Sequence, residues 1–164
     1  MPDSLSPAKR SANMAAIHSS NTVPEVLLRK ALFRQGFRYR ITAKKLPGRP
    51  DIVFPRYHAV IFVHGCFWHG HWCPKYRLPK SNGHYWAEKI HRNKIRDHDA
   101  LEKLLDAGWR VAIVWECVIK GPKRENRLAS TIDQIVVWIK GTDSELEIPT
   151  PFHSSTVGSE PVVP

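Results

Sequence analysis

The apolar positions along this chain predict one mixed α/β domain. Near-continuous apolar runs, typical of buried strands, lie at 51–54, 59–63 and 109–115. Apolar residues that recur every three or four positions, typical of helices, lie at 22–35, 85–107 and 125–140. A further strand is expected at 38–41, so the predicted order of elements is α-β-β-β-α-β-α.

Both ends of the chain lack this periodicity. Residues 1–20 are small, polar and basic, and we expect a flexible arm there with a short helix around 13–18; an inert terminus is the alternative. From residue 141 onward, prolines are mixed with serine, threonine and acidic residues, which predicts a disordered tail. The chain is therefore expected to divide into an arm at 1–20, a folded domain at 21–140 and an acidic tail at 141–164.

One carboxylate interrupts the apolar face of the helix at 85–107. The inward positions of that helix are Trp86, Ile90, Asp97, Leu101 and Leu104. Because a buried carboxylate is costly unless it is paired, Asp97 is expected to face a cationic or hydrogen-bonding partner. The alternative is an ion pair with Lys94 or Arg96 on its own helix.

The charge of the chain indicates a polyanionic partner. Lys and Arg number 25 against 15 for Asp and Glu, which gives a formal charge of +10 and a pI near 9.8. The basic excess lies in residues 1–50 and 75–98, on both sides of residues 63–73. Nucleic acid is the simplest such partner. Without a signal peptide or a run long enough to span a membrane, we expect a cytoplasmic protein with no membrane contact, which in a bacterium includes the nucleoid.

The segment 63–73, Val-His-Gly-Cys-Phe-Trp-His-Gly-His-Trp-Cys, concentrates metal-ligand side chains. A tetrahedral set would comprise Cys66, Cys73, the more distant Cys117 and either His69 or His71, and a closed set of this kind holds a structural zinc ion. The spacing alone leaves the choice of histidine open. Three unligated buried cysteines are the alternative, and an odd count argues against a disulfide framework.

These motifs resemble those of the very short patch repair (Vsr) DNA mismatch endonucleases. The matching stretches are Arg10-Ser-Ala-Asn-Met14, Thr22 to Glu25, Pro47-Gly-Arg-Pro-Asp51, Phe62 to His69, His71, Cys73, Trp86, Lys89, Asn93, Arg96-Asp97, Gly108-Trp109 and Trp115-Glu-Cys117. The resemblance implies a monomer with a restriction-endonuclease-like core, in which helices flank a mixed central β-sheet, plus a structural zinc site. It assigns His71 to the zinc together with Cys66, Cys73 and Cys117.

The resemblance also implies magnesium-dependent catalysis at Asp51. A hard carboxylate oxygen at a strand start suits Mg²⁺, and Pro50-Asp51 matches the beginning of the usual restriction-enzyme pattern. The (Asp/Glu)-x-Lys that normally follows is absent, because the next strand ends in Val63-His64. In this family the main-chain carbonyl of residue 63 helps to hold Mg²⁺ instead. Glu25 would lie near the metal, although the helix dipole alone also explains an anion in that first helical turn.

The same resemblance implies a general base and a mismatch substrate. His69 would activate the attacking water, Asp97 would orient His69, and His64 would assist at the phosphate. The implied reaction is strand-specific nicking of double-stranded DNA 5′ to the T of a T:G mismatch, of the kind left when 5-methylcytosine deaminates. Mismatch-repair proteins are further expected partners. The alternatives are a zinc-stapled DNA-binding module without catalysis, and a restriction-type endonuclease that cuts paired DNA.

Aromatic and basic side chains complete the expected DNA interface. The aromatic residues Phe67, Trp68 and Trp86 resemble those that this family wedges into the base stack beside the mismatch, where unstacking is cheapest. Packing over the zinc, or in the core for Trp86, is the alternative. Contacts with the DNA backbone are expected from Lys9, Arg10 and Lys89, the first two in a clamping arm.

Overall fold

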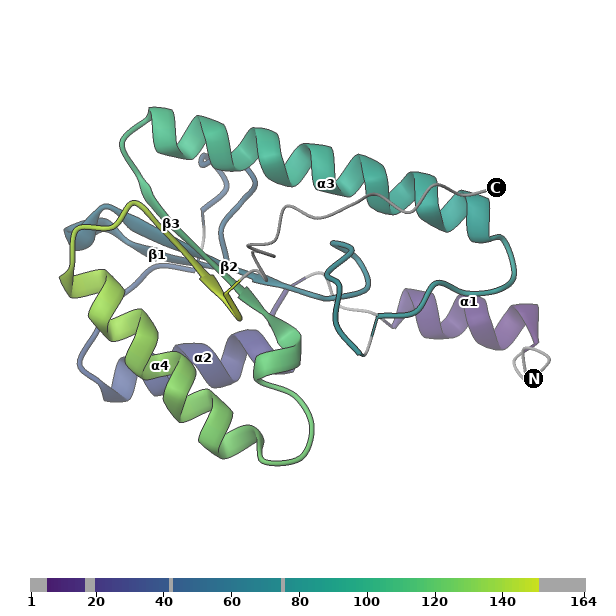
Figure 1. Cartoon of the computed structure of the whole chain (residues 1–164), viewed down its shortest axis with the longest axis horizontal. Coiled ribbons are helices and arrows are strands. Elements are labelled where there is room, and N and C mark those ends of the chain that lie inside the picture. Colours follow the sequence, from purple (N-terminus) through teal and green to yellow (C-terminus); the bar gives the residue numbers. More distant parts are fainter. Residues whose placement is uncertain (1–5, 17–19, 42, 75, 151–164) are drawn as a thin grey trace, which may run out of the picture.

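The computed structural model describes residues 6–16, 20–41, 43–74 and 76–150, and it has a four-stranded mixed sheet between helices (Figure 1). The strands are β1 (Ile52–Phe54), β2 (Ala59–His64), β3 (Arg110–Trp115) and β4 (Glu145–Ile148). The helices are α1 (Pro7–Ala15), α2 (Val23–Arg34), α3 (Gly83–Asp106) and α4 (Arg124–Lys140), with 3₁₀ turns η1 (Pro55–Tyr57) and η2 (Glu116–Val118). The mixed α/β class predicted from the sequence is confirmed. No helix in this described part is long and apolar enough to cross a membrane.

The two faces of the sheet carry separate parts of the core. Helix α3 covers one face, whereas α2 and α4 cover the other (Figure 1). On the α3 face, Val60 and Phe62 of β2 pack with Leu104 of α3. On the opposite face, the alternate β2 residues Ala59 and Ile61 pack with residues of α2 and α4. His64 follows the alternation of Val60 and Phe62, so its ring belongs to the α3 face.

The strand register brings the chemistry to one edge of the sheet. The order is β1-β2-β3-β4, with β1 antiparallel to β2 and the other pairs parallel. Because β2 and β3 run parallel with His64 opposite Trp115, the segments that follow both strands leave from the same edge. Ile52 pairs with Ile61 in the antiparallel pair, so the residue before β1 lies beside the end of β2. Asp51, the Cys66 segment and the Cys117 segment therefore meet there.

Three expectations about secondary structure are wrong. The strand at 38–41 is reduced to a single bridge between Arg40 and Val53. The helix in the arm is α1 rather than 13–18. The tail predicted to be disordered from residue 141 instead contributes β4, which pairs with β3 and extends the folded domain beyond residue 140. Residues 1–5, 17–19 and 151–164 of the arm and tail lie outside the described residues.

Candidate functional site

The ends of β2 and β3 gather four potential metal ligands. The ligand atoms of Cys66, His71, Cys73 and Cys117 all lie within 4.8 Å of one another. His71 Nδ1 is 3.4 Å from Cys66 Sγ and 3.6 Å from Cys117 Sγ. For zinc bonds of about 2.3 Å to sulfur and about 2.0 Å to nitrogen, neighbouring ligand atoms of a tetrahedron lie about 3.5 Å apart. The geometry of these side chains therefore fits one tetrahedral ion.

Neighbouring groups hold this cluster in place. The His71 ring stacks on Trp115 at 4.3 Å, and Trp115 Nε1 donates to Glu147 Oε1 of β4 at 2.7 Å. The Cys66 backbone N–H donates to Glu116 Oε1 at 3.1 Å. Burial raises the pKa of the Cys66 thiol, and a coordinated dication would oppose that shift by stabilising the thiolate. Trp115, Glu147 and Glu116 thus help to fix the positions of side chains that could bind a metal ion.

His69 faces away from this cluster and forms a second group on the α3 side. Its Nδ1 lies 2.5 Å from Asp97 Oδ2, and its ring stacks on His64 at 3.8 Å with the planes 2° apart. Asp97 therefore pairs with His69 rather than with Lys94 or Arg96 of its own helix. A hydrogen bond at Nδ1 leaves Nε2 of a neutral imidazole with a free lone pair. Such a nitrogen can accept a proton from water.

His64 is an uncharged imidazole at neutral pH. Its side chain is buried against the α3 face of the sheet, with 7% of the residue exposed. Burial, reinforced by the neighbouring His69, lowers the pKa of His64 to about 3, while Asp97 opposes the shift. His64 can therefore offer a hydrogen bond to a ligand but no positive charge.

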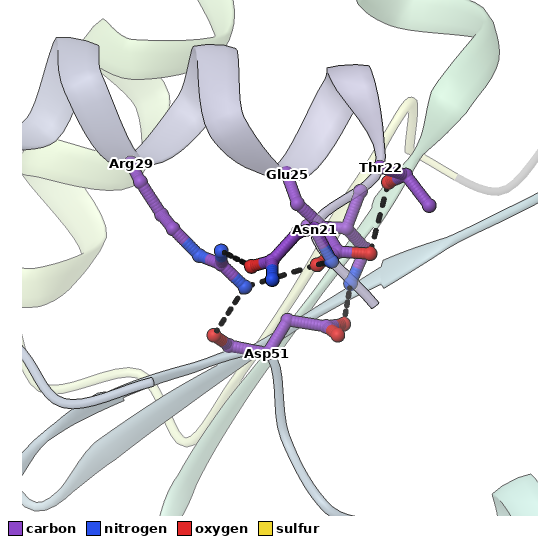
Figure 2. Close-up of polar contacts among 6 residues, drawn as sticks. Asn21, Thr22, Glu25, Arg29 and Asp51 are labelled. Carbon is purple, nitrogen blue, oxygen red and sulfur yellow. Dashed lines mark hydrogen bonds and ion pairs between the residues drawn. The ribbon is translucent and has the colours of Figure 1, made fainter. Parts of the chain in front are cut away.

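Asp51 is a partly buried carboxylate at the mouth of the β1–β2 hairpin. Its Oδ2 accepts the backbone N–H of Val63 at 2.7 Å (Figure 2). Burial raises the pKa of Asp51 to about 6; the Val63 hydrogen bond opposes this, the charge of Glu25 adds to it, and Arg29 and His69 oppose it. A carboxylate that is costly to ionise without a cation is a reasonable divalent-metal ligand.

Glu25 is almost fully buried, and its carboxylate accepts hydrogen bonds from three donors. Oε2 accepts the backbone N–H of Asn21 and an Arg29 Nη2 hydrogen bond, both at 2.9 Å. Oε1 accepts the hydroxyl of Thr22, also at 2.9 Å (Figure 2). Glu25 lies in the first turn of α2, where the helix dipole favours an anion, and its charge also acts on Asp51.

The three expected wedge residues form one aromatic cluster. Ring centroids of Phe67, Trp68 and Trp86 lie 5.1 to 5.9 Å apart in edge-to-face contacts. Lys89 Nζ sits 5.5 Å from both tryptophan rings. All three aromatic residues are half-buried and pack on one another rather than within the two core clusters. Trp72, by contrast, is 93% exposed.

One open cleft unites these groups. Its lining includes residues of α2, β2, β3 and α3 and of the segment that precedes β1, among them Glu25, Asp51, Val63, His64, Phe67, Trp68, His69, Lys89 and Asp97. The four thiol and imidazole ligands do not line it, so the two candidate metal positions are distinct. Of the arm residues, Lys9 is exposed on α1, and the Arg10 side chain lies outside the described residues.

The sequence did not single out two polar residues of this region. Arg29 contacts Glu25 and the Asp51 backbone, and its position four residues after Glu25 was a usable signal because helix ion pairs have that spacing. Glu147 supports Trp115 from β4. No local pattern indicated Glu147, because the segment from residue 141 onward lacks the periodicity of a strand or helix and was therefore expected to be disordered.

Comparison with known proteins shows clear sequence relatives of this chain. Residues 2–75 match the family model described as DNA mismatch endonuclease Vsr. The chain is 48% identical over 140 residues to the type II nicking enzyme V.NmeAIP of Neisseria meningitidis, a match that spans 83% of this chain and all of the relative. It is 41% identical over 150 residues to the DNA mismatch endonuclease Vsr of Escherichia coli, spanning 92% of this chain and 96% of the relative.

Proposed function

The chain belongs to the Vsr family of DNA mismatch endonucleases and is a DNA endonuclease, and we propose that it nicks duplex DNA 5′ to the T of a T:G mismatch with Mg²⁺. The observation that carries the proposal is the meeting of Asp51 with the His69–Asp97 pair in one cleft beside an aromatic cluster. A nuclease needs a place for a metal, a base for water and a means to hold the phosphate. These residues can supply all three.

Asp51 is the proposed Mg²⁺ ligand, together with the main-chain carbonyl of Val63. The hydrogen bond from Val63 N–H occupies Oδ2, and among the described residues no donor contacts Oδ1, so this oxygen is available to a hard cation. When bound, Mg²⁺ neutralises charge at the scissile phosphate and at the leaving oxygen. Glu25 would act on the ion through water, because its carboxylate is already held by protein donors.

His69 is the proposed general base. With Asp97 hydrogen-bonded to Nδ1, Nε2 takes a proton from water. The resulting hydroxide forms a bond to phosphorus as the bond from phosphorus to the 3′ oxygen breaks. The products are a 5′ phosphate on the T and a 3′ hydroxyl on the preceding nucleotide, after that oxygen takes up a proton. His64, stacked on His69 and uncharged, would donate a hydrogen bond to the phosphate.

The aromatic cluster is proposed to select the mismatch. Phe67, Trp68 and Trp86 present three rings next to the candidate catalytic groups, and Lys89 lies over two of them. A T:G step costs less to unstack than a paired step, so a wedge favours it before any base edge is read. A structural Zn²⁺ on Cys66, His71, Cys73 and Cys117 would fix the segment that carries Phe67, Trp68 and His69.

A nicking assay on matched duplexes tests the proposal. Two duplexes of the same sequence, one with a single T:G pair and one with T:A, are incubated with and without Mg²⁺. We expect a single cut 5′ to the mispaired T, only in the T:G duplex and only with Mg²⁺. Equal cutting of the T:A duplex would support a restriction-type enzyme for paired DNA, and the absence of metal-dependent nicking would contradict the proposal.

A further inference from the structure

Arg29 is a buried cation that contacts Asn21, Glu25 and Asp51. Only 9% of the residue is exposed. Its Nη1 donates to Asn21 Oδ1 at 2.7 Å, and its Nη2 donates to Glu25 Oε2 at 2.9 Å and to the Asp51 backbone carbonyl at 3.3 Å (Figure 2). Asn21 precedes α2, whereas Asp51 precedes β1. One guanidinium therefore ties the start of a helix to the start of a strand.

Helix stability alone does not account for this arrangement. Glu25 already receives the Asn21 N–H and the Thr22 hydroxyl, and it lies in the first turn, where the helix dipole favours an anion. Moreover, Arg29 Nε is buried without a hydrogen-bond partner among the described residues. An unsatisfied buried donor is costly, and an exposed i,i+4 pair would avoid that cost. The buried position therefore indicates a role at the site.

The contacts of Arg29 determine which oxygen of Glu25 can accept a further hydrogen bond. Oε2 has both of its lone pairs engaged, by Asn21 and Arg29, whereas Oε1 receives Thr22 alone among the described residues. The lone pair that remains belongs to Oε1, and Glu25 and Thr22 both line the cleft. Mg²⁺ in proteins keeps several of its water ligands. Glu25 is thus oriented to accept a hydrogen bond from such a water.

Arg29 also balances charge between the two carboxylates. Its Nη2 contacts both the Glu25 carboxylate and the Asp51 backbone carbonyl. A fixed cation that contacts one of them and the peptide of the other reduces their repulsion without occupying the free Asp51 oxygen.

We propose that Arg29 is a positioning residue for the metal site, which holds Glu25 and the Asp51 peptide so that Mg²⁺ meets its ligands already in place. This inference rests on the proposed metal-dependent nicking. A positioning role and a purely electrostatic effect of Arg29 predict opposite changes in metal affinity when Arg29 is removed. A cation beside a metal repels it, so by charge alone the loss of Arg29 would tighten binding, whereas loss of an outer partner that orients ligands weakens metal binding by about 10- to 100-fold.

The test compares Arg29→Met and Arg29→Lys with Arg34→Met, a control substitution on the exposed last turn of the same helix. The binding readout is the Kd of the zinc-loaded protein for Mn²⁺, measured from the spin-resonance signal of the free ion. Mn²⁺ is a paramagnetic substitute for Mg²⁺, and it does not displace zinc because thiolate and imidazole ligands bind it more weakly. The second readout is the Mg²⁺ concentration that gives half-maximal nicking of a T:G duplex.

We expect Arg29→Met to raise both the Kd and the half-maximal concentration about tenfold or more, with the rate at saturating Mg²⁺ largely restored. Arg29→Lys should give intermediate values of both quantities, because it keeps the charge but loses the paired hydrogen bonds of the guanidinium group. Arg34→Met should match the unsubstituted protein. If the Kd and the half-maximal Mg²⁺ concentration of Arg29→Met are unchanged or lower, with unchanged zinc content and circular dichroism, the inference about Arg29 is overturned. The proposed function is not affected by that result.

Two further outcomes also decide the question: a failure of Arg29→Met to fold, and an absence of activity in the unsubstituted protein. If Arg29→Met does not fold, Arg29→Lys decides, since it keeps a buried cation; an unchanged metal requirement there refutes positioning. If the unsubstituted protein neither binds Mn²⁺ nor nicks the T:G duplex with Mg²⁺, the proposed function fails and the inference fails with it.

Discussion

Substitution of Asp51 by Asn should abolish nicking and, at the same time, stabilise the metal-free protein. The amide keeps an oxygen that can accept the Val63 N–H, at 2.7 Å from Oδ2 in the native chain, but it carries no charge. Burial raises the pKa of Asp51 from 3.8 to about 6. At about 1.36 kcal/mol per pKa unit, this shift means that ionised Asp51 costs the fold about 3 kcal/mol.

The sign of the effect follows from linkage. The folded-state pKa of Asp51 is the higher one, so between pH 3.8 and about 6 the folded protein binds more protons than the unfolded chain, and stability falls as pH rises. The cost is absent below the unfolded pKa and complete above the folded one. Removing the charge should therefore raise the free energy of unfolding by about 3 kcal/mol at pH 8 and by about half of that at pH 5.

Urea unfolding of the zinc-loaded proteins without Mg²⁺ measures this difference. Asp99→Asn, which removes an exposed carboxylate from α3, is the control and should change stability by less than about 0.5 kcal/mol. Added Mg²⁺ should stabilise the native protein more than it stabilises the Asp51→Asn variant. The variant should still bind the T:G duplex. The reasoning is refuted if Asp51→Asn is no more stable at pH 8, or if its advantage does not shrink at pH 5.

Three further substitutions test the other groups. His69→Ala should slow single-turnover nicking by about 10²- to 10⁴-fold with duplex binding retained; a native rate would exclude a general base there. Cys117→Ser should lose zinc and melting temperature together, and full zinc content with unchanged melting would refute the ligand assignment. Trp68→Ala should reduce the preference for binding T:G over T:A duplex by about 5- to 150-fold, since a stacked base contributes about 1–3 kcal/mol. Trp72→Ala, the exposed control, should keep that preference; equal losses would contradict the wedge.

Strong local signals made most of the fold predictable. The helix expected at 22–35 is α2, because Thr22 precedes it, Gly36 follows it with a positive φ, and its apolar residues have helical spacing. The segments at 38–41 and 145–148 were assigned wrongly because neither has enough local signal. Glu145–Ile148 is a short strand whose formation depends on pairing with β3, a contact distant in sequence. Its ordering is a tertiary effect.

The candidate site was predictable only where its chemistry is local in sequence. Spacing indicated the metal cluster but left His69 and His71 open, because both lie in the same short run. Gly70 separates them: its φ of +64° turns the chain, and a side chain there would collide with Ile90 and Lys94 of α3. The turn directs His69 to Asp97 and His71 to the thiols. That division depends on α3 lying against the loop, which no spacing within 63–73 encodes.

Three groups that each carry an energetic cost line the same cleft, and their sharing it has a physical reason. Asp51 resists ionisation, His64 resists protonation, and Arg29 Nε lacks a partner among the described residues. Each cost would fall if these groups moved into water, so something must hold them in place. The sheet edge does so from one side, and the proposed zinc at Cys66 and its partner ligands would do so from the other. The proposed metal ion and a substrate phosphate would then find charges and donors already fixed, and their binding would offset these costs.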